Sequence, residues 1–107
     1  MFIQINTDNR VDGHEGMVAR LEELARAKLE RFGERITRVE IHVSDLNGPS
    51  ESPDLIRAQV ELRPAGRRPL SASDTAGDAE AAVAGALGKA ATAFDRQIGR
   101  TTTRKGH

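Results

Sequence analysis

Two stretches of the chain alternate between apolar and polar residues. The first is RITRVEIHVSD at residues 35–45, and the second is LIRAQVELRP at residues 55–64. A period of two over this length is typical of a strand with one buried face and one exposed face. We therefore predict strands near 36–44 and 55–63. The apolar positions expected to be buried are Val39, Ile41, Val43, Ala58, Val60 and Leu62.

Two shorter segments extend this pattern. Residues 2–7 alternate Ile3 and Ile5 with polar neighbours and predict a strand. The segment PAGRRP at residues 64–69 is typical of a hairpin turn, and LSAS after it predicts a short strand near 70–74. The last three strands follow one another along the chain, which favours an antiparallel meander.

Between residues 14 and 32 the apolar period changes to that of a helix. We predict a helix near 14–32. Asp12 and Glu15 have the spacing of a capping box at its start, and Gly33 suits a left-handed cap at its end. The apolar stripe comprises Val18, Leu21, Ala25, Leu29 and Phe32, flanked by Met17 and Leu24.

A second amphipathic helix is predicted near 76–98. Thr75 and Asp78 have the spacing of a capping box at its start, and Gly99 is expected to end it. Its apolar stripe comprises Ala79, Val83, Ala86, Leu87, Ala90, Phe94 and Ile98.

Gly85 and Gly88 interrupt this second helix away from its apolar stripe. Each costs about 1 kcal/mol relative to alanine in a helix interior. They either permit close approach by a partner or are simply tolerated. We favour tolerance, because an isolated glycine is a weak signal.

The predicted domain organisation is one domain at residues 1–100 followed by a basic, flexible tail at 101–107. The polar segment 45–54 is predicted to be a loop. Its three carboxylates do not have the spacing of a calcium-binding EF-hand loop, so we predict no metal site there.

The predicted order of elements is β-α-β-β-β-α. A right-handed crossover lays the first strand parallel to a strand of the sheet, with the first helix on its face. The second helix is expected to cover the same face. The expected fold class is therefore α+β: a two-layer sandwich in which two helices cover one face of a four-stranded sheet and water covers the other.

The amino-acid composition indicates the broad class of protein. The 107 residues are 37% apolar and 30% charged, which is typical of a globular domain, and 16 basic residues balance 16 acidic ones. The chain has no cysteine, no run of about 20 apolar residues for a membrane span, and no signal-peptide pattern at its start. We therefore expect a cytoplasmic protein without disulfides and without a membrane span.

Catalytic chemistry is not indicated by the sequence. The histidines, His14, His42 and His107, show no metal-ligand or His–acid spacing, and no nucleophile–base set is visible. No glycine-rich loop follows a strand to hold a phosphate. We therefore expect no enzyme activity, no cofactor and no small-molecule substrate.

Clusters of basic residues are candidates for contact with RNA phosphates. On the second predicted helix, Lys89, Arg96 and Arg100 fall within about 40° of one another around the axis. From Lys89 to the chain end, five basic residues stand against one acidic residue, a local charge of +4. Such a stripe either holds phosphates without reading bases or simply keeps a surface soluble. Further candidates are Arg67, Arg68, Arg20, Arg31 and Lys28.

Aromatic content limits the mode of RNA recognition. The three aromatic residues are all phenylalanines, and two of them, Phe32 and Phe94, lie on apolar stripes. A stacking platform for single-stranded bases is therefore not expected. Contact with the shape and backbone of folded RNA is the remaining mode.

Three segments carry a family resemblance: MFIQINTDN at the start, LERFGERITRVEIHVSD at 29–45, and PLSASDTAGDAEAAVAGALGKAATAFDRQI at 69–98. In order and spacing they resemble the ribosome hibernation promoting factor and ribosome-associated inhibitor A family. Members of that family end the first helix with a phenylalanine, and they carry a lysine in the second helix where Lys89 stands. The resemblance covers about residues 1–100.

The resemblance implies a fold related to double-stranded-RNA-binding domains. It also implies binding to the small ribosomal subunit and blocking of its tRNA and mRNA sites, under stress or in stationary phase. Long members add a C-terminal dimerisation domain that these residues do not include, so a monomer is expected. The alternative is a protein-interaction module that has kept the fold and uses the exposed sheet face or a free strand edge.

Overall fold

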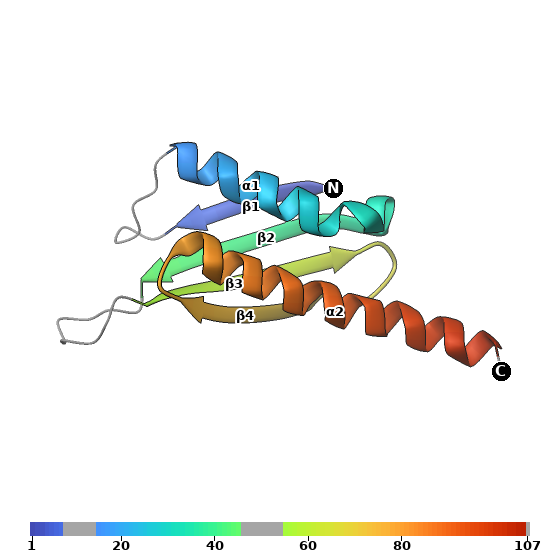
Figure 1. Ribbon diagram of the computed structural model, residues 1–107. Coiled ribbons are helices and arrows are strands. Elements are labelled where there is room, and N and C mark those ends of the chain that lie inside the picture. The colour runs from blue at the N-terminus through green and yellow to red at the C-terminus, as the bar shows by residue number, and fades with distance from the viewer. Residues whose placement is uncertain (8–14, 46–54, 107) are drawn as a thin grey trace.

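The computed structural model describes residues 1–7, 15–45 and 55–106, and for residues 15 and 100–106 it describes the course of the backbone alone. Figure 1 shows the order of elements along the chain, which is the predicted order with one short 3-10 helix added. The elements are β1 (Phe2–Thr7), α1 (Glu15–Leu29), the 3-10 helix η1 (Glu30–Arg35), β2 (Ile36–Asp45), β3 (Ile56–Pro64), β4 (Leu70–Ala76) and α2 (Ala79–Gly106).

Within the described residues, the strands form one four-stranded sheet in the order β1-β2-β3-β4. β1 runs parallel to β2, with Ile3 opposite Val39. β2, β3 and β4 are antiparallel neighbours. Both the predicted meander and the predicted parallel crossover through the first helix are therefore confirmed.

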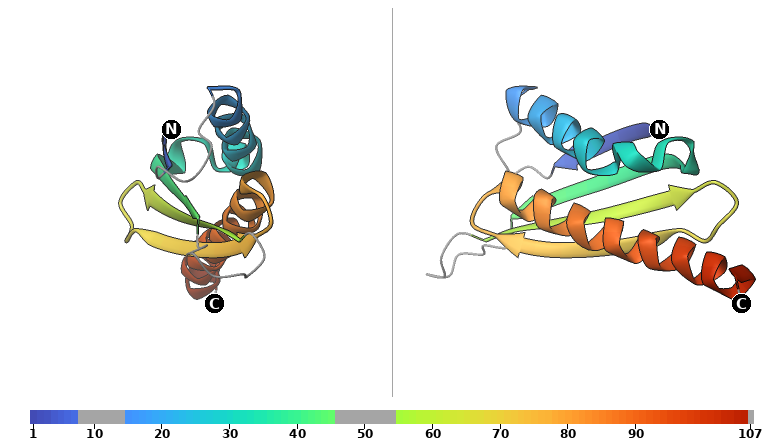
Figure 2. Two further views of the ribbon diagram at one scale, coloured as in Figure 1. Left: turned by 90° about the vertical axis from the view of Figure 1, so that its left-hand side faces the viewer. Right: turned by 45° about the vertical axis from the view of Figure 1, so that its right-hand side comes forward.

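Both helices cover the same face of the sheet, as the view along the molecule in Figure 2 shows. Between the two layers lies one apolar core, in which the rings of Phe32 and Phe94 stand 4.8 Å apart. Phe94 is fully buried and Phe32 is 4% exposed. The α+β two-layer sandwich and the predicted core positions of both rings are confirmed.

The register of the two long strands follows the alternation in the sequence. The six apolar positions predicted to be buried on β2 and β3 are all at most 1% exposed. Arg38, Glu40 and His42 lie on the opposite face, where they are half-buried or exposed. A shift of one residue in the pairing would reverse this distribution, so the apolar pattern fixes the register.

The end of the first helix differs in detail from the prediction. The α-helix ends at Leu29 instead of Phe32, and η1 continues the chain to Arg35. Gly33 has the predicted positive φ of 55°, but its ψ of −128° lies outside the left-handed helical region. The chain therefore kinks at Gly33 on its way into β2, and the backbone N–H of Ile36 donates a hydrogen bond to the carbonyl of Gly33.

The start of the second helix was predicted too early. Thr75 belongs to β4, and α2 begins at Ala79. The capping residue is Asp78, whose Oδ1 accepts a hydrogen bond of 2.8 Å from the backbone N–H of Ala81. This bond satisfies one of the free N–H groups of the first turn, so the capping-box assignment to Thr75 was wrong.

The end of the second helix was also predicted too early. Helical backbone continues to Gly106, so Gly99 does not end α2. Among the described glycines, Gly33 and Gly66 alone have a positive φ, so Gly99 lacks the backbone conformation of a left-handed cap. Most of the segment predicted as a tail at 101–107 is thus helical in backbone, and its flexibility stays a prediction.

Two predicted features lie outside the described residues. One is the capping box formed by Asp12 with the side chain of Glu15. The other is the acidic loop, of which the structure describes Asp45 and not 46–54.

Candidate RNA-binding surface

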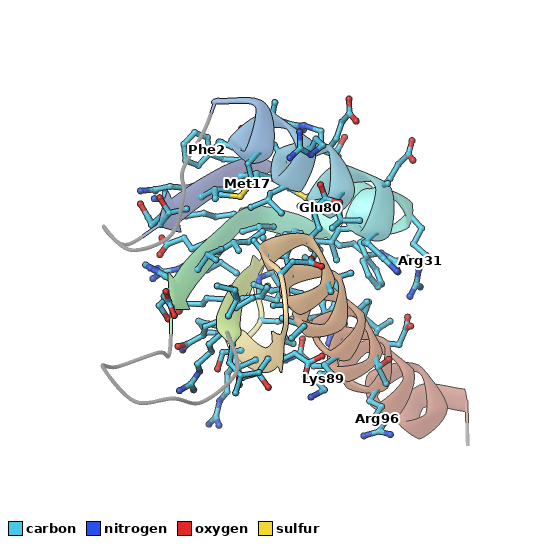
Figure 3. All side chains as sticks on the ribbon, turned by 60° about the vertical axis from the view of Figure 1, so that its left-hand side comes forward. Phe2, Met17, Arg31, Glu80, Lys89 and Arg96 are labelled. Carbon is cyan, nitrogen blue, oxygen red and sulfur yellow. The ribbon has the colours of Figure 1, made fainter. Side chains whose placement is uncertain are left out.

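Lys89 and Arg96 project from the same side of α2, away from the core (Figure 3). Both side chains are exposed. Seven residues of helix separate them, which is about 10 Å along the axis. The backbone of Arg100 continues the same helix, and its side chain is not described. The structure thus brings two of the three predicted stripe residues onto one surface.

The surface of α2 around Lys89 and Arg96 is shallow and open to solvent. A hollow of about 680 Å³ lies there, and its lining includes Lys89, Arg96 and the side of Asp74. The remaining lining residues are all small: Ala84, Gly85, Gly88, Thr92 and Ala93. A bulky group can therefore approach the helix backbone closely between the two positive charges.

Asp74 explains the glycine at position 85. It lies at an inward-facing position of β4, paired with Ala58, where the alternation calls for an apolar residue. A Cβ atom at Gly85 would stand 1.8 Å from its Oδ2. The favoured interpretation of Gly85 as merely tolerated was therefore wrong, because it permits close approach by a carboxylate of the same chain. A Cβ atom at Gly88 would meet nothing within 4 Å beyond its own stretch of helix. This agrees with the interpretation that Gly88 is simply tolerated.

Lys89 is held in place by the same carboxylate. Its Nζ lies 3.3 Å from Oδ1 of Asp74 and donates a hydrogen bond of 3.2 Å to the backbone carbonyl of Ser73. The Lys89 side chain remains 59% exposed. Its ammonium is consequently positioned over the β4 edge while still open to a ligand.

Alanine substitutions should distinguish Gly85, which makes room for Asp74, from Gly88, which makes room for no other side chain. Gly88→Ala should raise the free energy of unfolding by about 0.5–1 kcal/mol, because it removes a glycine from a helix interior without a clash. Gly85→Ala should lower it, because the new methyl group displaces Asp74 and overpacking commonly costs about 1–3 kcal/mol. Urea titration measures both. Asp74→Ala in the Gly85→Ala background should recover stability, and stabilisation by Gly85→Ala alone would refute this role for Asp74.

Arg20 on α1 and Arg31 on η1 are paired with acidic residues of α2. Nε of Arg20 donates a hydrogen bond of 2.6 Å to Glu80. Arg31 makes two parallel bonds to Asp95, of 3.0 and 2.7 Å. All four side chains are about half exposed or more, so these pairs contribute little to stability. Figure 3 shows Arg31, and Glu80 as the partner of Arg20, on a different side of α2 from Lys89 and Arg96.

The bidentate contact between Arg31 and Asp95 shifts the pKa of both side chains. The hydrogen bonds from Arg31 lower the pKa of Asp95, and those same bonds raise the pKa of Arg31. Because the folded-state pKa of Asp95 is lowered, its contribution to stability is present above about pH 4. That contribution is lost as the pH falls through the lowered pKa.

Asp95→Asn should strengthen binding to RNA. The substitution removes a carboxylate that competes with phosphate for the guanidinium of Arg31. If Arg31 contacts phosphates as the sequence predicts, affinity for a folded RNA should rise severalfold, and the salt dependence should steepen by up to about one counterion. A salt series of binding titrations measures both.

Glu61→Gln is the matched control for Asp95→Asn. Glu61 also lies near an arginine, 3.6 Å from Arg63, but on the exposed face of the sheet. An equal rise in affinity in both variants would show that net charge alone is responsible, and would contradict a role for Arg31.

The remaining candidates lie apart from the α2 surface. Arg67 and Arg68 are exposed on the hairpin between β3 and β4, which turns through Gly66 at a φ of 69°. Nε2 of Gln97 donates a hydrogen bond of 3.4 Å to the carbonyl of Arg68 and ties the hairpin to α2. Lys28 is exposed on α1. The eight predicted residues therefore form separate groups instead of one patch.

The open face of the sheet carries its own polar network. The guanidinium of Arg38 donates hydrogen bonds to Glu40, at 2.6 Å, and to Gln4. The bond from Arg38 is the main cause of a lowered pKa at Glu40. Arg38 also covers the ring of Phe2, at 4.9 Å from its centroid, and Phe2 is 55% exposed. The pattern of the strands predicted this wet face, and the aromatic side chain on it was not predicted.

Other kinds of site find little support in the part of the chain that the structure describes. There, no three histidine or acidic side chains gather closely enough to hold a metal ion. No helix among the described residues combines the length and the apolar character that crossing a membrane requires.

Comparison with known proteins agrees with this architecture. The crystal structure of the Protein Y N-terminal domain from Thermus thermophilus superimposes with a TM-score of 0.70 at 19% identity, covering 90% of this chain and 98% of that chain. The structure of a ribosomal subunit interface protein from Coxiella burnetii gives a TM-score of 0.69 at 19% identity, covering 92% and 99%. At this identity the likeness establishes the fold alone.

Two comparisons of the sequence address the family to which the chain belongs. No curated protein matches the chain in a sequence search. Residues 3–105 match the family described as Sigma 54 modulation protein / S30EA ribosomal protein. This match spans nearly the whole chain and covers every described helix and strand almost completely. The chain therefore belongs to the Sigma 54 modulation protein / S30EA ribosomal protein family.

Proposed function

We propose that this protein binds the small ribosomal subunit through rRNA phosphates and blocks the tRNA and mRNA sites under stress. Family membership supports association with the ribosome, since the family description names a ribosomal protein. The similar Coxiella burnetii protein is described as a ribosomal subunit interface protein. In this role the chain acts in the cytoplasm as a binding protein and not as an enzyme.

The observation that carries the proposal is the open cationic side of α2. Lys89 and Arg96 are exposed there, and the residues between them are small, so the surface of the helix is shallow. A-form RNA offers its phosphates and ribose hydroxyls at the surface, while its base edges in the deep groove are hidden. Two positive charges with a shallow surface between them suit contact with such a backbone, without reading of bases.

The length of the helix suits several phosphate contacts. From Lys89 to Arg100 the axis covers about 16 Å, enough for two or three successive phosphates. α2 has 28 residues, or about 42 Å, and it extends past the hairpin end of the sheet (Figure 1). This arrangement leaves the far part of α2 accessible to a large, rigid partner.

Sedimentation with purified subunits tests the proposal. The protein should pellet with the small subunit and not with the large one, and it should displace labelled tRNA from the small subunit as its concentration rises. It should also inhibit translation in a cell extract. Association with the large subunit alone, or a stable complex that still holds tRNA with unchanged affinity, would contradict the proposal.

The exposed sheet face is the second candidate surface, for a protein partner. Phe2 is an exposed aromatic residue held under Arg38, and aromatic and arginine side chains are enriched at interface centres. If Phe2→Ala abolished binding to ribosomes while Lys89→Gln left it unchanged, contact would run through this face, to a ribosomal protein.

A further inference from the structure

The hollow on α2 that is lined by Lys89 and Arg96 also contains a carboxylate, that of Asp74. A surface that held phosphates alone is not expected to include one, because a carboxylate and a phosphate repel each other. Asp74 also requires an adaptation of the fold, since α2 carries Gly85 where a larger residue would collide with it. The place of Asp74 beside Lys89 therefore bears on which ligand the hollow accepts.

The two carboxylate oxygens of Asp74 have different surroundings. Oδ1 accepts a hydrogen bond of 3.0 Å from the backbone N–H of Thr75 and one of 3.3 Å from Nζ of Lys89. Oδ2 lies against the surface of α2 at Gly85, and no described residue donates a hydrogen bond to it. The Asp74 side chain is 33% exposed, and Oδ2 is not buried from solvent. Oδ1 thus fixes the carboxylate, while Oδ2 keeps its capacity to accept a hydrogen bond.

The chemistry of a carboxylate determines what can bind to Oδ2. An ionised carboxylate only accepts hydrogen bonds, so the ligand must supply a donor. In RNA, the 2′-hydroxyl of ribose is a donor that lies directly next to a phosphate. A phosphate held by Lys89 therefore brings a 2′-hydroxyl close to Asp74. The ammonium and the carboxylate side by side match a phosphate and a hydroxyl side by side.

The rest of the hollow leaves room for a sugar ring. It measures about 680 Å³, and apart from Asp74, Lys89 and Arg96 its lining residues are small. From Gly85, where Oδ2 lies, to Lys89 the helix rises about 6 Å, and from Lys89 to Arg96 it rises about 10 Å. A ribose can therefore lie on α2 next to Oδ2, with its phosphate on Lys89 and a further phosphate within reach of Arg96.

We propose that Asp74 lets this surface distinguish RNA from DNA, with Oδ2 accepting a hydrogen bond from the 2′-hydroxyl next to the phosphate on Lys89. The inference rests on the proposed function for its RNA partner and adds a determinant of specificity. Lys89 and Arg96 alone would hold either nucleic acid, because both carry the same phosphates. A deoxyribose leaves the carboxylate facing a phosphate backbone without a donor, which is unfavourable.

Two RNA duplexes of the same sequence test the proposal. One is unmodified, and in the other fluorine replaces every 2′-hydroxyl, which preserves the A-form helix but removes the hydrogen-bond donor. Both carry the same phosphates, so the salt dependence of binding should be equal. The protein should bind the unmodified duplex about tenfold more tightly, as expected for one hydrogen bond to a charged group. Fluorescence anisotropy titration measures both affinities.

Asp74→Ala should reduce this tenfold preference to about one. The variant should fold, because Asp74 pairs with the buried Ala58 at a position where an apolar residue suits the alternation of β4. Glu61→Ala is the matched control: it removes the same charge from a side chain that is 35% exposed, on the opposite face of the sheet. This control should keep the preference. Circular dichroism melting checks that both variants are folded.

The outcomes separate the role of Asp74 from the proposed function. Equal binding of the two duplexes by a protein that binds small subunits would overturn this role and leave the proposed function standing. Binding to small subunits without binding to either duplex would also overturn it, since the proposed contact is with an A-form backbone. A preference that survives in Asp74→Ala would assign the discrimination to another residue. Failure to bind small subunits as well as both duplexes would refute the proposed function, and this inference with it.

Discussion

Phe94→Ala should lower the free energy of unfolding by about 3–5 kcal/mol, the largest loss expected from any single substitution at a described residue. Phe94 is fully buried on α2, and its ring packs against that of Phe32 on η1 at an interplanar angle of 59°. Removing it leaves a cavity where α2, η1 and the sheet meet. Such a loss is a large share of the stability of a domain of this size.

Urea titration of the variant measures this loss. Phe2→Ala is the matched control, because Phe2 is 55% exposed and lies on the open face of the sheet. Its substitution should cost less than about 1 kcal/mol. A similarly small cost for Phe94→Ala would mean that the ring contributes little to the core, and would reopen the question of stacking on bases.

Replacement of Lys89, Arg96 and Arg100 by glutamine should remove binding to the small subunit while leaving the fold intact. Affinity should fall on the order of a hundredfold if each phosphate contact is worth about 1 kcal/mol. Lys89 and Arg96 are exposed, so their loss should not disturb the core. Translation in an extract should recover accordingly.

A second triple variant controls for net charge. Arg26, Arg57 and Arg63 are exposed and lie away from the outward side of α2, and their replacement by glutamine removes the same charge. Binding by this control should be nearly unchanged. If the first triple variant still sediments with the small subunit, phosphate contact through α2 is refuted and the sheet face becomes the candidate surface.

The sequence predicted the sheet well because burial alternates from Val39 to Val43 on β2 and from Arg57 to Pro64 on β3. Val39 and Val60, for example, have polar neighbours on both sides and are fully buried. The helix ends were predicted less well, since several residues at each end have capping chemistry. Asp78 and Thr75 both suit a cap, and only the length of β4 decides between them.

The candidate surface could be predicted only in part. The turn of a helix places Lys89 beside Arg96, because they lie on one helix. The partners of Arg20 and Arg31 are 60 and 64 residues away, and they depend on how α1 and η1 pack against α2. Local spacing carries no information about that packing. Asp74 was missed for a related reason: it interrupts an apolar alternation, and the glycine that accommodates it stands on another element.

Titration of the labelled protein with purified small subunits over a salt series tests ribosome binding through phosphates most directly. Saturable binding is predicted, with the logarithm of the association constant falling linearly with the logarithm of salt concentration. The magnitude of this slope should be at least about two to three, because each neutralised phosphate contributes nearly one unit. In the variant with glutamine at positions 89, 96 and 100, the magnitude should decrease by about two to three units. Absence of binding at low salt, or an affinity that does not change with salt, would contradict this mechanism.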